Sequence, residues 1–226
     1  MKRRRAPRGA GEQLREEIFD ATTDLLLETG HVKDVSIRSV AQRVGVTPPS
    51  IYLHFADKDA LLDAVCARYF EKLDEQMQSV AARQPSTIEV LRAQGLAYVR
   101  FAMKTPQLYR IAAMGESRPG SDVDVALNSS AFVHLRVTVE KLMAEGIYPP
   151  GDSTATALEL MTVAHGVAAM LISKPHLPWG DVEDFADRVL KAVCLGHITM
   201  GAVSPGAPPK ETVAQLKGLL DGEHSR

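Results

Sequence analysis

The sequence predicts an all-α protein, with a small N-terminal helical domain followed by a larger helical domain. Apolar residues recur at three- and four-residue spacings over most of the 226 residues, as they do on one face of a helix. Segments that alternate apolar and polar residues between turns, which are typical of strands, are missing, and aromatic residues make up only 5% of the chain. Glycines and prolines separate the periodic segments, at places where helices end.

Two helices are expected before residue 46. The first covers residues 12–29, where apolar residues fall on one face and Gly30 follows as a stop. The second begins after Ser36, whose hydroxyl can accept a hydrogen bond from a backbone N–H of the first turn. Gly45 ends it, because glycine takes a positive φ without steric cost.

A third helix is expected directly after this turn. Thr47 is its predicted N-cap, and Pro48 suits the first helical position, where the missing N–H is no loss. The helix can extend only to about His54, because Asp57 is the predicted N-cap of a longer helix over residues 58–82. The N–H groups that follow Thr47 are expected to form a site for an anion.

The rest of the chain predicts a larger helical domain. Further helices are expected over residues 87–104, 106–114, 123–145, 153–173 and 181–200, with a Gly/Ser/Pro-rich loop at 116–121 and a turn at 148–151. The expected domains are a basic arm (1–11), the N-terminal domain with its connecting helix (12–84), the larger domain (85–200) and a Gly/Pro-rich tail (201–226). One or two amphipathic turns are expected within the tail, at 211–220.

The composition is that of a soluble globular protein. Apolar residues account for 45% of the chain and charged residues for 24%. The most apolar stretch covers only residues 160–172, whereas a membrane span needs about 20 residues. The basic N-terminus continues into a charged segment, so we do not expect a signal peptide. Cys66 and Cys194 lie in apolar helical patterns, which predicts buried thiols, no disulfide framework and a cytoplasmic location.

The short third helix and the tight turn before it form the pattern of a helix-turn-helix. Such a unit places its last helix in the major groove of DNA. A helix of about eight residues is too short to be stable alone, so Ile51 and Phe55, four residues apart, are expected to anchor it. Pro49, Ser50 and Leu53 then lie on the opposite face, toward the DNA bases.

Polar residues beside this helix suit contacts with DNA. Tyr52 and His54 fall on its flanks, where each can donate a hydrogen bond to a phosphate oxygen, and Lys58 is placed to add a third contact. Arg38, at the start of the second helix, can bind guanine O6 and N7 through two hydrogen bonds. Thr47 is expected to be largely committed as a cap.

Basic residues gather at the N-terminus, although the whole chain carries a net charge of −2. Residues 1–11 hold several basic side chains and no acidic one. Lys2, Arg3, Arg4 and Arg5 can enter a neighbouring minor groove, or they can remain a disordered tail that attracts DNA only through its charge.

The segment VSIRSVAQRVGVTPPSIYLHFADKDALLDAV, residues 35–65, resembles the helix-turn-helix of the TetR family of transcriptional regulators. The resemblance extends over about residues 12–69. It is carried by the Gly45-Val46 turn, by Ser50-Ile51-Tyr52, by Phe55 and by the Asp57-Lys58 start of the connecting helix. It implies that the chain binds double-stranded DNA, with contacts from Arg38, Thr47, Pro49, Ser50, Tyr52, His54 and Lys58.

The larger domain is similar to the WHG-type effector domain of some TetR regulators. TPQLYR (residues 105–110) and the His165-Gly166 pair carry this similarity, and Met161 stands where that type usually has tryptophan. The similarity implies dimerisation and a small-molecule pocket. The candidate ligand-binding residues are Tyr98, Phe101, Tyr109, Met114, Phe132, Met161, His165 and Trp179. Plain core packing is the alternative for each, and the scarcity of charges favours a mostly apolar or aromatic ligand.

Two helices predict a homodimer independently of the resemblance. The helix over residues 153–173 is apolar on nearly every side, and the helix over 181–200 carries two apolar stripes, so each needs two partners. The candidate interface residues are Ala164, Ala168, Phe185, Val189 and Val193. A two-fold dimer would bind a palindromic operator.

Other functions find no support in the sequence. No nucleophile beside a base, phosphate-binding loop or metal-ligand spacing can be recognised, so neither enzymatic activity nor a cofactor or metal is expected. The sequence therefore predicts a homodimeric repressor that a small ligand releases from a palindromic operator. An activator, or a regulator controlled by a protein partner instead of a small molecule, remains the alternative.

Overall fold

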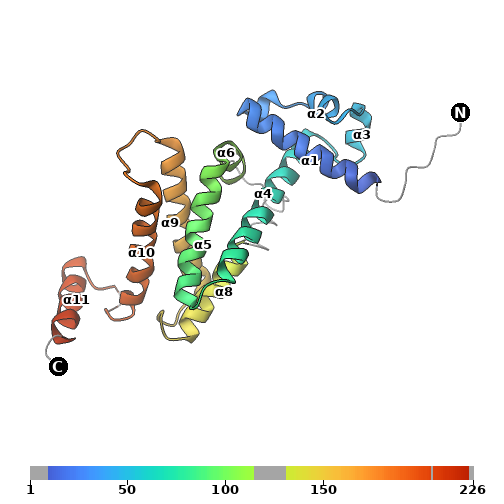
Figure 1. Cartoon of the computed structure of the whole chain (residues 1–226). Coiled ribbons are helices and arrows are strands. Elements are labelled where there is room, and N and C mark those ends of the chain that lie inside the picture. Colours follow the sequence, from blue (N-terminus) through green and yellow to red (C-terminus); the bar gives the residue numbers. More distant parts are fainter. Residues whose placement is uncertain (1–9, 115–130, 205, 224–226) are drawn as a thin grey trace, which may run out of the picture. The chain divides into compact units, whose positions relative to one another are not determined.

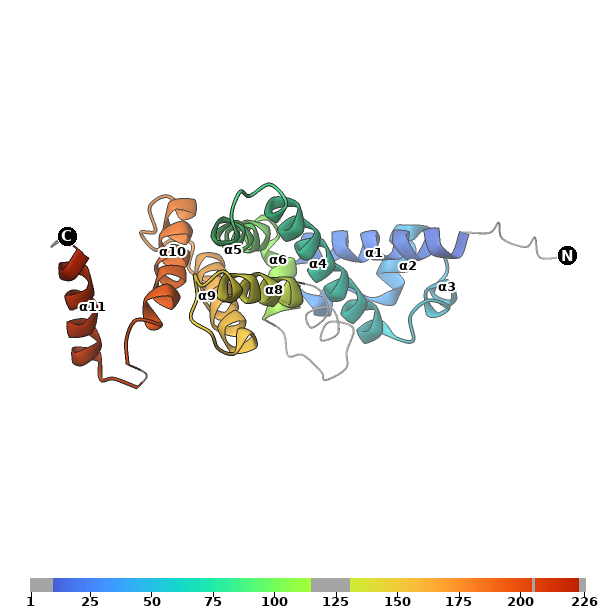
Figure 2. The same ribbon diagram turned by 90° about the horizontal axis from the view of Figure 1, so that it is seen from below.

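The computed structural model describes residues 10–114, 131–204 and 206–223 (Figures 1 and 2). These residues form helices joined by turns, and no strand occurs among them, which confirms the all-α prediction. The chain divides into two compact units. Unit 1 holds Met1–Asp74 and Ala102–Ala131, and unit 2 holds Glu75–Phe101 and Phe132–Arg226.

Unit 1 contains the N-terminal helices and one later helix. Its elements are α1 (Ala10–Thr29), the 3-10 helix η1 (Val32–Asp34), α2 (Ile37–Val44), α3 (Pro48–Tyr52), most of α4 (Lys58–Ala81) and α6 (Pro106–Ala113). The core between them is built from large apolar side chains that are almost completely buried, including Ile18, Leu26, Val40, Ile51 and Leu61. α6 contacts α1, so this segment belongs with the N-terminal helices although it follows α5 in sequence.

The ends of α1 and α2 follow the predicted signals. Gly30 (φ 71°) donates its N–H to the Leu26 carbonyl and ends α1. The Ser36 hydroxyl accepts from the Ser39 N–H at 3.1 Å, while the Ser39 hydroxyl accepts from the Ser36 N–H at 2.9 Å, forming a capping box. Gly45 (φ 78°) ends α2 in the left-handed conformation.

α3 is shorter than predicted, because it ends at Tyr52 rather than at His54. The N–H groups of His54 and Phe55 both donate to the Ile51 carbonyl, at 2.9 and 3.1 Å. This turn carries Phe55 back toward the core. α4 then begins as predicted, with a carboxylate oxygen of Asp57 accepting from the Ala60 N–H at 2.8 Å.

Unit 2 contains the longer helices of the second half of the chain. Its elements are most of α5 (Thr87–Lys104), α8 (Ala131–Ala144), α9 (Ser153–Ser173), α10 (Val182–Met200) and α11 (Pro209–Glu223), together with the end of α4. One core cluster centres on Val139, Leu142 and Tyr148, and a second on Val99, Ala164 and Leu190. Two ion pairs tie α5 to α10: Arg92 binds Asp187 through both carboxylate oxygens, and Arg100 pairs with Glu183.

Some sequence predictions for the second half differ from the structure, and others fall outside the described residues. The first residues of the helix expected at 123–145, and the loop expected at 116–121, lie outside the described residues. The tail expected at 201–226 contains a full helix, α11, rather than one or two turns. α9 is long and apolar enough to cross a membrane, judged by length and composition alone, although core helices of soluble proteins meet the same condition.

The two cysteine thiols are free and shielded from water. Cys66 is buried in unit 1, and this burial raises the pKa of its thiol to about 12. Cys194 is half-buried in unit 2, where burial also raises the pKa of its thiol. Neither thiol is therefore a reactive thiolate at neutral pH.

Candidate nucleic-acid interface and effector region

Two buried side chains hold α3 in place. Ile51 lies on the inner face of α3 and has no exposed surface, and Phe55, just beyond the helix, is 5% exposed. The Phe55 ring meets the Phe19 ring of α1 edge to face, with centroids 5.4 Å apart. A five-residue helix cannot be stable alone, so these contacts fix its orientation. The predicted anchoring role of Ile51 and Phe55 is confirmed.

Two arginines cover this aromatic pair. The Arg15 guanidinium of α1 lies 5.3 Å from the Phe19 ring centre and 5.6 Å from that of Phe55. The Arg68 guanidinium of α4 lies 5.1 Å from the Phe19 ring centre and pairs with Glu16. Cation–π contacts of this kind join α1, α4 and the end of α3. Neither arginine was predicted from the sequence, although the four-residue spacing of Arg15 and Phe19 could have indicated one.

Two polar contacts fix the neighbouring elements. Arg43 of α2 binds both carboxylate oxygens of Glu28 in α1, at 2.9 and 2.6 Å. Lys58 donates from Nζ to the Val32 carbonyl at 2.7 Å, which joins the start of α4 to η1. The sequence predicts Lys58 as a phosphate contact. The structure shows it half-buried with one N–H engaged, and an ammonium group has two more to donate.

The predicted DNA-contacting side chains lie around α3 and remain accessible. Tyr52 is 54% exposed and Leu53 is 84% exposed, although both are large and partly apolar. Arg38, Thr47 and Pro49 are exposed, and Ser50 and His54 are half-buried. The exposed side of α3, its flanks and the start of α2 therefore form the candidate nucleic-acid interface (Figure 1).

The N-terminus of α3 differs from the expectation in two ways. Thr47 is the N-cap, but its hydroxyl lies 3.2 Å from the Ser50 hydroxyl and makes no capping hydrogen bond. The predicted anion site is wrong, because Pro48 and Pro49 have no N–H and the Ser50 N–H donates to the Thr47 carbonyl at 2.8 Å. The consequence is that both hydroxyls lie together on the exposed side.

The basic arm lies outside the described residues. Arg3, Arg4 and Arg5 belong to the segment before residue 10, so their part in DNA binding stays a prediction.

The effector region predicted for unit 2 contains a polar pair. The Tyr98 hydroxyl of α5 lies 3.3 Å from Nδ1 of His165 in α9, and the contact is partly buried. Burial lowers the pKa of His165, so its imidazole is neutral at pH 7. Trp179 packs against the same core cluster as Tyr98, and its ring lies tilted beside that of Phe185, with centroids 4.9 Å apart and an interplanar angle of 54°.

The other predicted ligand residues are distributed over both units. Phe132 and Met161 pack against the cluster that contains Tyr148. Phe101 is 9% exposed in unit 2. Tyr109 is buried and Met114 is 49% exposed, and both belong to unit 1.

Gln94 is a buried polar residue that was not predicted from the sequence. It lies on α5 one turn before Tyr98 and is 1% exposed. Its Oε1 accepts no hydrogen bond from the described part of the chain. A buried acceptor without a donor costs about 1–3 kcal/mol, so proteins rarely leave one unmatched. Only the polarity of glutamine in an apolar helical pattern signalled this position.

Two of the predicted dimer residues are wrong. Ala164 and Ala168 are 6% and 0% exposed within a single chain, because they face the core of their own unit. Phe185, Val189 and Val193 are half-buried against the two core clusters. An evenly apolar helix such as α9 gives no sequence signal for which side faces its own core.

Comparisons with known proteins agree with this architecture. Residues 18–65 match the family described as bacterial regulatory proteins, tetR family, and residues 91–193 match the tetracyclin repressor-like, C-terminal domain. The HTH-type transcriptional regulator EthR of Mycobacterium tuberculosis is 27% identical over 191 residues, which cover 80% of this chain and 87% of EthR. The HTH-type transcriptional regulator YobS of Bacillus subtilis is 32% identical over 156 residues, which cover 68% of this chain and 76% of YobS.

Solved structures show the same fold. A protein with unknown function from Rhodococcus sp. RHA1 superposes with a TM-score of 0.73 and 23% identity, over 88% of this chain and 99% of that protein. The family match over residues 18–65 includes α3, the exposed helix that Ile51 and Phe55 anchor. The chain belongs to the TetR family of bacterial DNA-binding transcriptional regulators.

Proposed function

We propose that this regulator is a cytoplasmic homodimeric repressor, and that a small, uncharged and mostly apolar or aromatic molecule releases it from a palindromic operator. The observation that supports this proposal most is the accessible face of α3, held by Ile51 and Phe55. Its relatives are transcriptional regulators and not enzymes.

The proposed DNA contacts follow from the chemistry of this face. Arg38 reads guanine through two hydrogen bonds, and Pro49 and Leu53 press on thymine methyl groups. Tyr52, His54 and Lys58 bind phosphates, which positions the helix without reading sequence. Ser50 is the hydrogen-bonding side chain on the outer side of α3, with the Thr47 hydroxyl beside it.

The proposed dimer uses the outer faces of α9 and α10. Leu158 of α9 and Leu195 of α10 are 45% and 48% exposed in the single chain. Between the large side chains α9 has small residues, and a Cβ added at Gly166 would meet no atom within 4 Å. Such a surface allows two helices from each subunit to pack closely around a two-fold axis.

The proposed effector site lies beside Gln94, Tyr98 and His165. These residues provide an acceptor without a donor, a hydroxyl and a neutral imidazole within a largely apolar unit. An apolar molecule with one O–H or N–H group would satisfy Gln94 Oε1 and bury the rest of its surface. A carboxylate would place a second acceptor against this oxygen, so we expect anionic acids to bind poorly.

The release mechanism requires a connection between the units. α4 starts beside η1 in unit 1 and ends in unit 2, and α6 follows α5 directly and contacts α1. A ligand that shifts the end of α4 or of α5 therefore acts on elements that also hold the DNA-binding helices. A change of about 1–3 kcal/mol in the relative stability of two conformations is enough for such control.

The test combines operator selection with effector release. The purified chain is used to select duplexes from a random library, and binding to the selected duplex is followed by fluorescence anisotropy. An organic-solvent extract of small molecules from cells that carry the protein is then added in fractions. We expect at least one fraction to release the duplex from the wild type, and Gln94→Leu to bind DNA normally while responding less. If no fraction changes either DNA binding or thermal stability, the small-molecule mechanism is wrong and control by a protein partner is favoured.

A further inference from the structure

We propose that Arg15 of α1 is an additional DNA contact, which binds a phosphate of the DNA backbone beside His54 and extends the candidate nucleic-acid interface onto α1. The inference rests on the proposed placement of α3 against DNA. Arg15 is the one basic residue of α1, whose other charged side chains are all acidic. The composition of this helix therefore gives no indication that it meets a polyanion.

The start of α1 lies beside α3, as both views show (Figures 1 and 2). A Cβ added at Gly11 would lie 3.9 Å from Cε1 of His54, so the imidazole packs next to the first turn of α1. Arg15 follows Gly11 by four residues and lies on the same side of the helix. Its guanidinium lies 5.6 Å from the ring centre of Phe55, the residue after His54. Arg15 and His54 therefore lie close to each other at the end of α3.

The positive charge of Arg15 is paired with no carboxylate among the described residues. Arg15 is exposed, and its guanidinium lies over the rings of Phe19 and Phe55. Such contacts leave the N–H groups at the edge of the guanidinium able to donate to phosphate oxygens. Arg68 differs, because it lies over the Phe19 ring but pairs with Glu16. Of the two arginines that share this ring, Arg15 is the one able to bind an anion without losing an ion pair.

Most acidic side chains of α1 face away from Arg15. The step of about 100° per residue places Glu17, Asp20 and Asp24 on the opposite side of the helix, where all three are exposed. Glu12 lies nearer, one turn before Arg15. It belongs to the first turn of α1, where the N–H groups of the helix end offset its negative charge. A phosphate beside His54 would therefore meet the positively charged side of α1.

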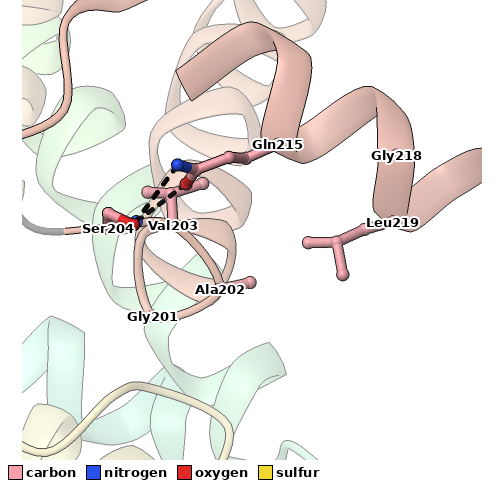
Figure 3. Close-up of a pocket in the computed structure, with 7 residues that line it drawn as sticks. All are labelled: Gly201, Ala202, Val203, Ser204, Gln215, Gly218 and Leu219. Carbon is pink, nitrogen blue, oxygen red and sulfur yellow. Dashed lines mark hydrogen bonds between the residues drawn. The ribbon is translucent and has the colours of Figure 1, made fainter. Parts of the chain in front are cut away.

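The aromatic contacts hold the Arg15 guanidinium in place before DNA binds. A long side chain that is already ordered loses less conformational freedom on binding, which strengthens the contact it makes. The hollow beside α11 has no such group, because the described side chains that line it, including Ser204 and Gln215, are uncharged (Figure 3). That hollow offers a phosphate no cation, whereas Arg15 offers one that is both exposed and ordered.

The test measures how the affinity for the selected duplex depends on salt concentration. Each phosphate bound by a cation contributes about 0.9 to the slope of log affinity against log salt concentration. Arg15→Gln should make the slope shallower by about this amount for each chain bound, and should weaken binding to unrelated duplexes by a similar factor. Arg68→Gln is the matched control, because it removes a cation from the same aromatic ring yet should keep the wild-type slope. Arg15→Lys should also keep it, since lysine retains the charge.

The salt slope separates a phosphate contact from a purely structural role. If the slope of Arg15→Gln equals that of the wild type, the inference is wrong even where the affinity itself falls, because lost packing does not change the number of phosphates bound. An equally shallow slope for Arg68→Gln overturns it as well. If circular dichroism shows that Arg15→Gln is unfolded, Arg15→Met decides, since it keeps a side chain against the rings without the charge. A wild type with no preference for the selected duplex overturns the proposed function itself.

Discussion

At the scale of single residues, Arg38 carries the most specific prediction. It is exposed at the second position of α2, and its guanidinium can form two hydrogen bonds with one guanine. Arg38→Ala should remove about 1–3 kcal/mol of discrimination at one guanine in each half-site. Titrations against single-base operator variants check this. Arg188→Ala, an exposed arginine of unit 2, is the control, and an Arg38 variant with unchanged base preference would refute the assignment.

Tyr52 should behave differently, since its hydroxyl is proposed to bind a phosphate. Tyr52→Phe removes one hydrogen bond and keeps the ring, which is 54% exposed. Affinity should fall by a similar factor for the operator, its variants and unrelated duplexes, because a phosphate contact carries no sequence information. A loss confined to the operator would show instead that Tyr52 reads bases.

His165 predicts a pH dependence of stability in unit 2. Its folded-state pKa is lowered by burial, so the unfolded chain binds a proton more readily than the folded chain. Its contribution is fully present above its unfolded pKa of about 6.5 and is lost as the pH falls through and below that value. His165→Gln should therefore lose less unfolding free energy between pH 7.5 and pH 5.5 than the wild type does. Equal losses in urea melts of the two proteins would contradict this.

Individual residues differ in how well the sequence predicted them. Ile51, Phe55 and Gly45 followed from helical spacing and backbone conformation, which are local properties. Gln94 and Ala164 did not, because their roles depend on which helices surround them. The Thr47 hydroxyl could have been predicted better, since the two following prolines leave only the Ser50 N–H for it to cap, and that group donates to the Thr47 carbonyl instead.

At the scale of elements, α3 owes its position to packing. Ile51→Ala should lower the unfolding free energy of unit 1 by about 2–5 kcal/mol, as expected for a fully buried isoleucine, and should abolish DNA binding. Leu53→Ala is the matched control, because Leu53 is 84% exposed and contributes little to stability. Chemical denaturation followed by circular dichroism distinguishes them. Equal stability of the two variants would show that Ile51 does not anchor α3.

Helix boundaries were most predictable where a side chain or a glycine determines them. Gly30 marked the end of α1, Ser36 the start of α2 and Asp57 the start of α4, each to within one or two residues. α3 was predicted two residues too long, because the turn that ends it depends on Phe55 reaching Phe19. α11 was predicted as one or two turns, since the glycines and prolines around it obscure a helical pattern that is itself short.

At the scale of the whole molecule, the chain passes between the two units three times. The crossings lie within α4, near the end of α5 and at the start of α8. A regulator that only bound DNA would need no second unit of this size. The boundary predicted at residue 85 missed the return of α6 to unit 1, because nothing local to α6 indicates its contact with α1.

Two copies of α3 are expected to bind one palindromic duplex, and titration of matched duplexes tests this directly. The selected palindrome, a single half-site and a scrambled duplex are titrated with the wild type at 0.15 M salt. We expect the palindrome to bind at least a thousandfold more tightly than the scrambled duplex, as specific regulators do, with two chains per duplex and a much weaker half-site. Equal affinity for the palindrome and the scrambled duplex would contradict the account.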